Sequence, residues 1–224
     1  MNLNKSLEFF DPEKCTADIH IIGCGAIGST LAEGLTRLGI KTLHLYDFDT
    51  VSAHNIANQM FFENQINELK VDAITQTLTA INPEIEIIKH PDGWKQGTPL
   101  SGYVFLCVDS IDLRKTIVKE NKYNNTIIAF FDLRMRLTDA QHFAASWHNE
   151  DYKNFLLQTM AFTDEEARAE TPVSACGTSL SVFFTVRTIV SYAIANFVKK
   201  VLHNQLYKTV LIDCNDFNIE AYAE

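Results

Sequence analysis

The most informative residues of this chain are three glycines that stand between two regular segments. Gly23, Gly25 and Gly28 form a G-x-G-x-x-G pattern. The apolar run before them, residues 18–22, predicts a buried strand, and residues 29–38 predict a helix. Glycine lets the backbone turn tightly and approach a ligand, and the N–H groups at a helix N-terminus attract an anion. The pattern predicts a phosphate-binding turn, although the same glycines would also permit close helix–strand packing.

An acidic residue stands where such a turn would need a ligand for ribose. Asp47 ends a second predicted strand, residues 42–46, about 20 residues beyond the last glycine. A carboxylate there accepts hydrogen bonds from both ribose hydroxyls and repels a 2′-phosphate. The alternative is that Asp47 only caps a turn, and Asp49 would point in a different direction. The turn and this acid together predict a nucleotide-binding βαβ unit.

The polar run after Asp47 bears on the choice of nucleotide. The spacing alone fits a dinucleotide, but a dehydrogenase has no evident use for residues 50–59. The run Asp47-Phe48-Asp49-Thr50-Val51, with Asn55 and Gln59, resembles the ATP-binding segment of the ThiF/MoeB/HesA family, relatives of the ubiquitin-activating enzymes. The family pattern is D-x-D-x-V…N-x-x-R-Q. The resemblance is in register over 18–138 and extends loosely to 202. Further matching residues are Lys70, Asn82-Pro83, Asp109, Arg114 and Arg134-Met135. Asp109 stands at the end of a predicted strand over 103–108.

The resemblance implies a role for each of these polar residues. Asp47 would bind the ribose, and Asp49 would lie beside it. Asn55, Gln59 and Lys70 would surround the phosphates, with Lys70 as a point cation. A solvated position on a helix predicted over 66–81 is the alternative for Lys70.

A metal role falls to the acid at the end of the fourth predicted strand. The carboxyl edge of an open α/β sheet is where ligands bind, and hard cations prefer carboxylate oxygen. By resemblance, Asp109 would hold Mg²⁺ against the triphosphate. The alternative is that Asp109 is the N-cap of the helix predicted over 112–121, a role that Asp112 could also fill.

Position 58 departs from the family pattern. The family places arginine directly before Gln59, whereas this chain has Asn58. Asparagine supplies no full charge to phosphoryl oxygens, and loss of such a charge costs orders of magnitude in rate. Some members receive a further arginine from the N-terminal segment of the partner subunit, but no arginine precedes Arg37 here. Either Lys14 or Arg134 replaces the charge, or the site binds nucleotide with weak or no turnover.

The cysteines and histidines show no spacing typical of a zinc site. The chain has five cysteines, without a C-x-x-C pair, and seven histidines, without an H-x-x-x-H pair. We therefore expect no zinc, unlike the many family members that carry two C-x-x-C pairs. Cys176 precedes a helix predicted over 179–202, where a thiolate would suit a thioester or persulfide role. An ordinary packed cysteine is the alternative. Cys24 and Cys107 are expected to be structural.

Composition limits the partners and the compartment. The net charge of −9 disfavours binding along a nucleic-acid backbone. The longest apolar stretch, residues 181–198, contains Arg187 and Asn196, so it predicts a buried or interface helix rather than a membrane span. The polar first residues do not resemble a signal peptide. Free thiols suit a reducing cytoplasm.

Strands and helices alternate through the first part of the chain. This alternation predicts an α/β fold, a Rossmann-like, mainly parallel sheet with helices on both faces and a small antiparallel C-terminal extension. The extension would contain a strand over 141–147, a polar crossover loop over 150–170, and an edge strand over 209–214. We expect one domain over 1–224. It would consist of a lead over 1–17, a nucleotide-binding core over 18–138, and a crossover region with helix and edge strand over 139–224. Within the core we expect further strands over 85–89 and 126–131 and a loop over 90–102.

The resemblance implies an adenylyltransferase that uses ATP and Mg²⁺. It would activate the C-terminal carboxylate of a small ubiquitin-like or sulfur-carrier protein with a Gly-Gly tail, or of a small molecule or peptide, and release pyrophosphate. Catalysis would rest on positioning and charge neutralisation. The apolar face of the helix over 179–202 suggests a homodimer. The alternatives are a catalytically impaired member or scaffold, supported by Asn58, and an NAD-dependent oxidoreductase, which leaves Asn55, Gln59 and Lys70 unexplained.

Overall fold

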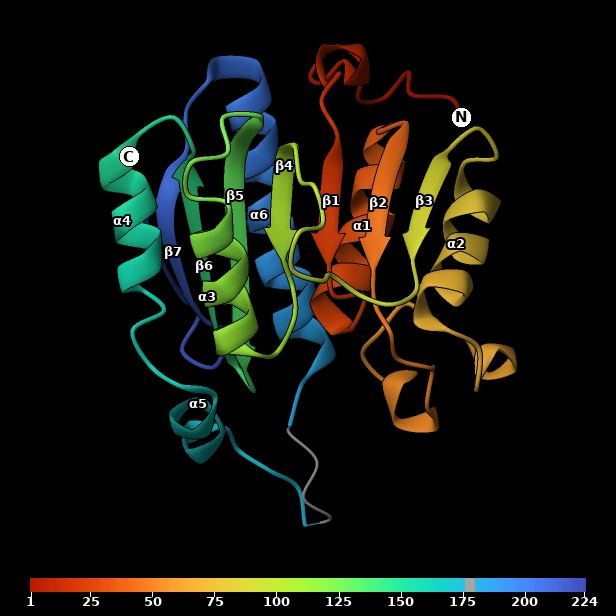
Figure 1. Cartoon of the computed structure of the whole chain (residues 1–224). Coiled ribbons are helices and arrows are strands. Elements are labelled where there is room, and N and C mark those ends of the chain that lie inside the picture. Colours follow the sequence, from red (N-terminus) through yellow and green to blue (C-terminus); the bar gives the residue numbers. More distant parts are fainter. Residues whose placement is uncertain (176–179) are drawn as a thin grey trace.

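The computed structural model describes residues 1–175 and 180–224. It contains an eight-stranded sheet in the order β3-β2-β1-β4-β5-β6-β7-β8 (Figure 1). Strands β1 to β5 are parallel, and β6, β7 and β8 continue the sheet in antiparallel pairs. This confirms the predicted fold class. The strands are β1 (Ile19–Ile22), β2 (Thr42–Tyr46), β3 (Glu86–His90), β4 (Gly102–Leu106), β5 (Ile127–Arg136), β6 (Asp139–Ser146), β7 (Tyr207–Asp213) and β8 (Asn218–Ala223).

Helices cover both faces of this sheet. On one face, α1, α2 and α6 pack over a core that includes Leu31, Ile74 and Phe197. On the other face, α3 and α4 pack over a second core that includes Ile117 and Leu156. Figure 1 shows α3 and α4 in front of the sheet and α1 and α6 behind it. The helices are α1 (Ala26–Leu38), α2 (Lys70–Ile81), α3 (Ile111–Glu120), α4 (Glu150–Gln158), α5 (Asp164–Glu170) and α6 (Phe183–His203).

The face of β1, β2 and β3 opposite α1 and α2 has no helix over it. The connection over 91–101 passes across this face instead (Figure 1) and adds Trp94 and Leu100 to the second core. The loop predicted there is confirmed. Histidine and tyrosine side chains of the three strands remain half-buried or buried beneath it.

Helices α1 and α2 begin three and four residues away from their predicted starts. Helix α1 begins at Ala26 because Gly25 is its N-cap, so Gly28 belongs to the first helical turn. Helix α2 begins at Lys70 rather than at residue 66. Residues 63–65 form a separate 3-10 turn, and Leu69 pairs with Thr50 in an isolated bridge. This bridge holds the chain extended before α2.

The polar segment over 150–170 is not the loop that we expected. It forms α4 and α5, each started by a side-chain cap. The Asn149 side chain accepts hydrogen bonds from the N–H groups of Asp151 and Tyr152, and Thr163 forms a capping box with Glu166. The T-x-x-E spacing is a recognised start signal, and the high polarity of the segment obscured it.

The predicted edge strand lies inside the sheet. Strand β7 pairs with β6 on one side and with β8 on the other, so β8 is the edge. The chain reverses between them through a polar turn in which Phe217 has a φ of 55°. Every residue of β8 is exposed, and its weak apolar pattern explains why the sequence did not predict it.

Helix α6 buries most of the apolar face that the sequence predicts. Val186, Ile189, Val190 and Ala193 are buried against the sheet and α1, whereas Phe183 and Phe184, in the first turn, are about half exposed. Within residues 1–175 and 180–224, no helix is long and apolar enough to cross a membrane.

A candidate nucleotide site at the carboxyl edge of the sheet

Three neighbouring strands end at the same edge of the sheet, at the point where the strand order reverses. Strand β1 pairs with β2 on one side and with β4 on the other. Ile22 is level with Tyr46 and with Leu106, so the segments that follow all three strands emerge side by side. Ligands of open α/β sheets bind at such a switch point. The glycine turn, Asp47 and Asp109 all lie in these segments.

The glycine turn is built for close approach of main chain. Gly23 has a φ of 96°, and a Cβ atom there would lie 2.8 Å from Cys107 C and from Val108 N. A Cβ atom on Gly28 would lie 1.8 Å from the Gly23 carbonyl oxygen. At Gly25, by contrast, such a Cβ would have no atom of the described residues within 4 Å apart from its chain neighbours. Gly23 and Gly28 therefore shape the turn, whereas Gly25 faces open space.

The N-terminus of α1 opens onto that space. Its N-cap residue is a glycine, no side chain caps it, and its first turn contains no acidic residue. The first N–H groups of a helix have no intrahelical acceptor and attract anions. The turn and the helix end therefore provide a cradle for a phosphate group.

Asp47 ties the glycine turn to the end of β2. Its Oδ2 accepts a hydrogen bond from Cys24 N at 2.6 Å, and its Oδ1 accepts one from Asp49 N at 2.8 Å. Burial raises the pKa of Asp47, while Lys70 and the two N–H groups act in the opposite direction. A carboxylate has about four lone-pair positions, so capacity for ribose hydroxyls remains. Asp47 both supports the turn, as the capping alternative requires, and stays available to a ligand.

Asp49 and Lys70 form an ion pair beside Asp47. Lys70 Nζ lies 2.8 Å from Asp49 Oδ2, and Lys70 N donates to the Asp49 carbonyl oxygen at 2.9 Å. Lys70 is buried, so the alternative of a solvated helix residue is wrong. An ammonium group has three N–H donors, and donors that do not bond Asp49 are available to a ligand.

The next two polar residues differ from each other in their contacts. Asn55 Oδ1 accepts a hydrogen bond from Ser52 N at 2.9 Å and so caps a 3-10 turn, Ala53–Asn55. Gln59 Oε1 is buried and has no hydrogen-bond partner within the described ranges 1–175 and 180–224. A buried acceptor without a donor is costly, which leaves Gln59 Oε1 free to accept from a bound molecule.

Asn58 bonds to the segment before α6. Its Nδ2 donates to Ser181 Oγ at 2.7 Å. Ser181 also bridges to Leu137, next to the end of β5. Cys176, the predicted thiol candidate, lies outside the described residues.

The two residues expected to replace the missing arginine are Lys14 and Arg134. Arg134 Nε lies 2.8 Å from Asp132 Oδ2, and Arg134 Nη1 donates to the Thr159 carbonyl oxygen at 2.7 Å. Asp132 is fully buried and also pairs with Arg114. Lys14 precedes the amino end of β1, at the opposite edge of the sheet from the glycine turn (Figure 1). Among the described residues neither Lys14 nor Arg134 forms a hydrogen bond or ion pair with Asn58, and replacement of the missing arginine by either residue stays a prediction.

Asp109 is exposed and does not cap α3. The N-cap of α3 is Ser110, whose Oγ accepts a hydrogen bond from Leu113 N at 3.0 Å. Both capping alternatives, Asp109 and Asp112, are wrong. Within residues 1–175 and 180–224 the Asp109 carboxylate makes no hydrogen bond or ion pair, so it is available to a cation at the switch point.

Asp164 is a residue of this edge that the sequence did not reveal. Its Oδ2 accepts a hydrogen bond from Ser110 Oγ at 2.7 Å, and its Oδ1 accepts one from Ile111 N. The N-terminus of α3 is therefore already occupied by an anion from α5. Ser181 and Asp132 were missed for the same reason, because their partners are distant in sequence and no local spacing marks them.

Two cysteines near the turn are buried and unreactive in character. Burial raises the pKa of the Cys107 thiol to about 12 and that of Cys24 well above its ordinary value. Both are structural, as expected, because a thiol that stays protonated is a poor nucleophile.

A family model and two kinds of relative match this chain. The model of the ThiF family matches residues 14–219. The chain belongs to the ThiF family. One similar sequence is ubiquitin-like modifier-activating enzyme 5 of Drosophila virilis, which is 33% identical over 125 residues that cover 48% of this chain and 31% of the relative. The enzyme of the same name from Oryza sativa subsp. japonica is 46% identical over 69 residues, which cover 31% of this chain and 16% of the relative. The chain thus spans less than a third of the length of these relatives.

Solved structures show that the ThiF-family fold extends across the chain. Escherichia coli MccB, solved with ATP, superposes with a TM-score of 0.71 at 18% identity, and PaaA superposes with a TM-score of 0.70 at 17% identity. Each alignment covers 95% of this chain and 65% of the other. At such identity the likeness concerns the fold.

The glycines of this ThiF-family turn should differ in their effect on stability. Gly28→Ala should lower the free energy of unfolding by more than about 2 kcal/mol, because the new methyl group overlaps the Gly23 carbonyl. Gly25→Ala should stay within about 1 kcal/mol of the parent, since its φ is −74° and the space is open. Urea unfolding followed by circular dichroism measures both, and equal losses would contradict this account of the turn.

Proposed function

We propose that the chain is an ATP-dependent adenylyltransferase. The observation that carries the proposal is the placement of Asp47 and Lys70 beside a glycine turn whose helix N-terminus is uncapped. One carboxylate for a ribose, one ammonium and a set of free N–H groups for phosphates match the parts of a nucleoside triphosphate.

Each residue of the site has a role in this proposal. Asp47 holds the ribose hydroxyls, and the N–H groups at the start of α1 hold the phosphates. Lys70 reduces the negative charge of the phosphates, with Asp49 fixing its position. Asp109, exposed at the switch point, is the ligand for Mg²⁺. The magnesium ion, when bound, supplies positive charge to the triphosphate oxygens.

The reaction needs positioning and charge rather than a protein nucleophile. An oxygen of the acceptor carboxylate attacks the α-phosphorus of ATP, the bond to the bridging oxygen breaks, and pyrophosphate leaves. The product is an acyl adenylate, from which AMP is a good leaving group for a later thiol. Cys24 and Cys107 are too deeply buried to take part, and a role for Cys176 stays a prediction.

The acceptor we propose is a small ubiquitin-like or sulfur-carrier protein with a C-terminal Gly-Gly. The names of the sequence relatives, ubiquitin-like modifier-activating enzymes, support this class. The C-terminal carboxylate of a peptide is the alternative acceptor, since the crystal structure of E. coli MccB has been determined with MccA. The free thiols among the described cysteines fit a cytoplasmic location, which we include in the proposal.

A second candidate function is nucleotide binding with little or no turnover. Asn58 is neutral and bonded to Ser181, and Arg134 is held by Asp132 and Thr159. A site that lacks the cation near the phosphates would bind ATP yet stabilise the transition state poorly. The NAD-dependent oxidoreductase alternative has no comparable support from the site.

A homodimer is part of the proposal. Phe183 and Phe184 are about half exposed at the start of α6, and Val173 and Leu180 are also exposed. Large apolar side chains gathered at one end of a helix are typical of a protein interface. A contact there would place the partner next to Ser181 and hence near Asn58.

Removal of the proposed magnesium ligand should abolish metal-dependent binding. Asp109→Ala should weaken Mg·ATP binding at least tenfold with an unchanged melting temperature, because the side chain is exposed. Asp112→Ala is the matched control, since it removes an exposed acid three positions away in the first turn of α3. Calorimetry should also show that NAD does not compete with ATP. Equal binding by both variants would refute the metal assignment, and tight NAD binding without ATP binding would refute the proposed function.

A cation at position 58 should raise the rate if charge is what the site lacks. Asn58→Arg should increase pyrophosphate release with a Gly-Gly acceptor about tenfold, which corresponds to about 1.4 kcal/mol of transition-state stabilisation. Asn58→Gln is the control, because it changes length without adding charge. An Arg variant no faster than the Gln variant would mean that another group already supplies the charge. Absence of pyrophosphate release from every form would favour the non-catalytic candidate.

Charge at the start of α6 should separate the proposed dimer. Light scattering of the parent at micromolar concentration should give twice the chain mass of 25.3 kDa. Phe184→Glu should give the monomer mass, because a buried carboxylate without a partner is costly at an interface. Phe217→Glu, in the exposed turn before β8, should leave the dimer intact. A monomeric parent would contradict the homodimer.

A further inference from the structure

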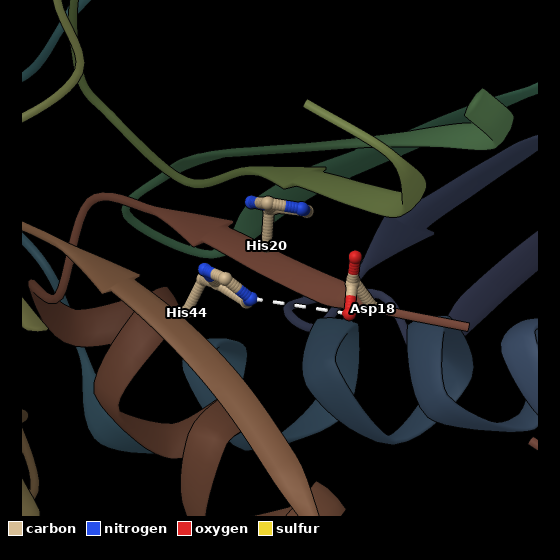
Figure 2. A group of neighbouring side chains, drawn as sticks. All are labelled: Asp18, His20 and His44. Atoms are coloured by element: carbon tan, nitrogen blue, oxygen red, sulfur yellow. Dashed lines mark ion pairs between the residues drawn. The ribbon is translucent and has the colours of Figure 1, made fainter. Parts of the chain in front are cut away.

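Two histidines and one aspartate converge on the face of β1 and β2 that no helix covers. His20 of β1 is level with His44 of β2 in the parallel register, and Asp18 immediately precedes β1. One ligand atom from each of the three residues lies within 4.8 Å of the others. Figure 2 shows the two rings stacked, with the Asp18 carboxylate at the same end of both.

Each of the three side chains has a hydrogen-bond partner outside the trio. His20 Nδ1 lies 2.9 Å from Tyr46 Oη, and His44 Nδ1 lies 3.3 Å from His90 Nε2. Asp18 Oδ2 accepts a hydrogen bond from Ser101 Oγ at 2.6 Å. His44 Nε2 and Asp18 Oδ1 then lie 4.0 Å apart. His20 Nε2 accepts a long hydrogen bond of 3.4 Å from Ser101 N, which a metal ion bound at this nitrogen would have to displace.

This pattern of partners is the one that ligating histidines need. A histidine that binds a metal through one ring nitrogen donates its other N–H to an acceptor, which fixes the ring. Tyr46 Oη is such an acceptor for His20, and His90 Nε2 is one for His44. Ser101 in turn orients the carboxylate of Asp18. All three side chains are therefore held from behind by residues outside the trio.

The electrostatic surroundings favour a cation. His20 is buried and His44 is half-buried, and burial favours the neutral form of an imidazole ring. Neutral imidazole is the form that binds metals. The groups that act electrostatically on the two rings include the acids Asp18 and Glu86 and the neighbouring His90. A divalent ion would therefore meet the negative charge of Asp18 and, beside His44, that of Glu86.

We propose that Asp18, His20 and His44 bind a divalent transition metal ion of the Zn²⁺ class. Two imidazoles and a carboxylate suit such ions, and three protein ligands leave a position open. Ligand atoms in a tetrahedral zinc site lie about 3.3 Å apart, for bonds of about 2.0–2.1 Å. The trio must therefore contract from 4.8 Å by about 1.5 Å. The half-exposed Asp18 side chain, which precedes the strand, provides that movement.

The metal site is separate from the proposed nucleotide site. His20 lies three residues before Gly23, which is about 10 Å along the strand. It also lies on the sheet face opposite α1. The expectation that the chain binds no zinc rested on spacing within single segments. Ligands on two neighbouring strands, 24 residues apart, escape such a search.

Zinc titration of the chelator-treated protein tests the proposal. The parent should bind one Zn²⁺ per chain by calorimetry, and its melting temperature should rise with zinc. Asp18→Asn and His44→Gln, both at positions with some exposure, should each weaken binding at least tenfold. His148→Gln and His203→Gln are matched controls, since both remove exposed histidines elsewhere, and should bind as the parent does. Tyr46→Phe, which removes the acceptor behind His20, should weaken binding about tenfold.

Two outcomes would overturn the metal site. One is a parent that does not bind zinc, or Asp18→Asn and His44→Gln variants that bind like the controls. The other concerns the cysteines, of which the chain has five. A cobalt-substituted protein should lack the intense sulfur-to-metal charge-transfer absorption, and its presence would assign the ion to thiolates instead. Neither result depends on ATP, so the proposed adenylyltransferase activity stands or fails separately.

Discussion

The carboxylate of Asp47 is the contact on which the nucleotide edge depends. It accepts a hydrogen bond from Cys24 N in the glycine turn and one from Asp49 N after β2. The first bond fixes the turn against the neighbouring strand, and the second directs Asp49 toward Lys70. Lys70 in turn is the first residue of α2, so the start of that helix is set by the same acid. One buried side chain thereby positions a turn, an ion pair and a helix.

The sequence predicted the parallel half of the sheet well, because local patterns determine it. Short apolar runs followed by glycine or aspartate marked β1, β2 and β4 within two residues of their observed bounds. The antiparallel half was harder to predict. Strand β8 has no apolar alternation strong enough to detect, and the caps Asn149 and Thr163 stand within a segment whose charge resembles that of a loop.

The candidate site was predictable in its residue types but only partly in its geometry. Asp47, Lys70 and the glycines follow motif spacing, and the structure brings them together. The surroundings of Asn58 and Arg134 could not be predicted, because Ser181, Asp132 and Thr159 come from distant parts of the chain. A motif assigns a residue to a site, whereas its partners decide which atoms remain available. The histidine cluster on β1 and β2 shows the same limit, because only strand pairing brings its members together.

The hydrogen bonds between Asp164 and the start of α3 also affect which of the two helix N-termini beside the switch point is available to an anion. Strand β1 leads into α1, and β4 leads into α3, so two helix dipoles converge on one edge. Asp164 occupies the positive end of α3 from within the molecule. Among the described residues no side chain caps α1, and its first turn contains no acidic residue, although the Asp47 carboxylate binds Cys24 N just before it. The protein thus satisfies the N-terminus of α3 with its own carboxylate, so an anion that bound at this edge would find free N–H groups at the start of α1 rather than at α3.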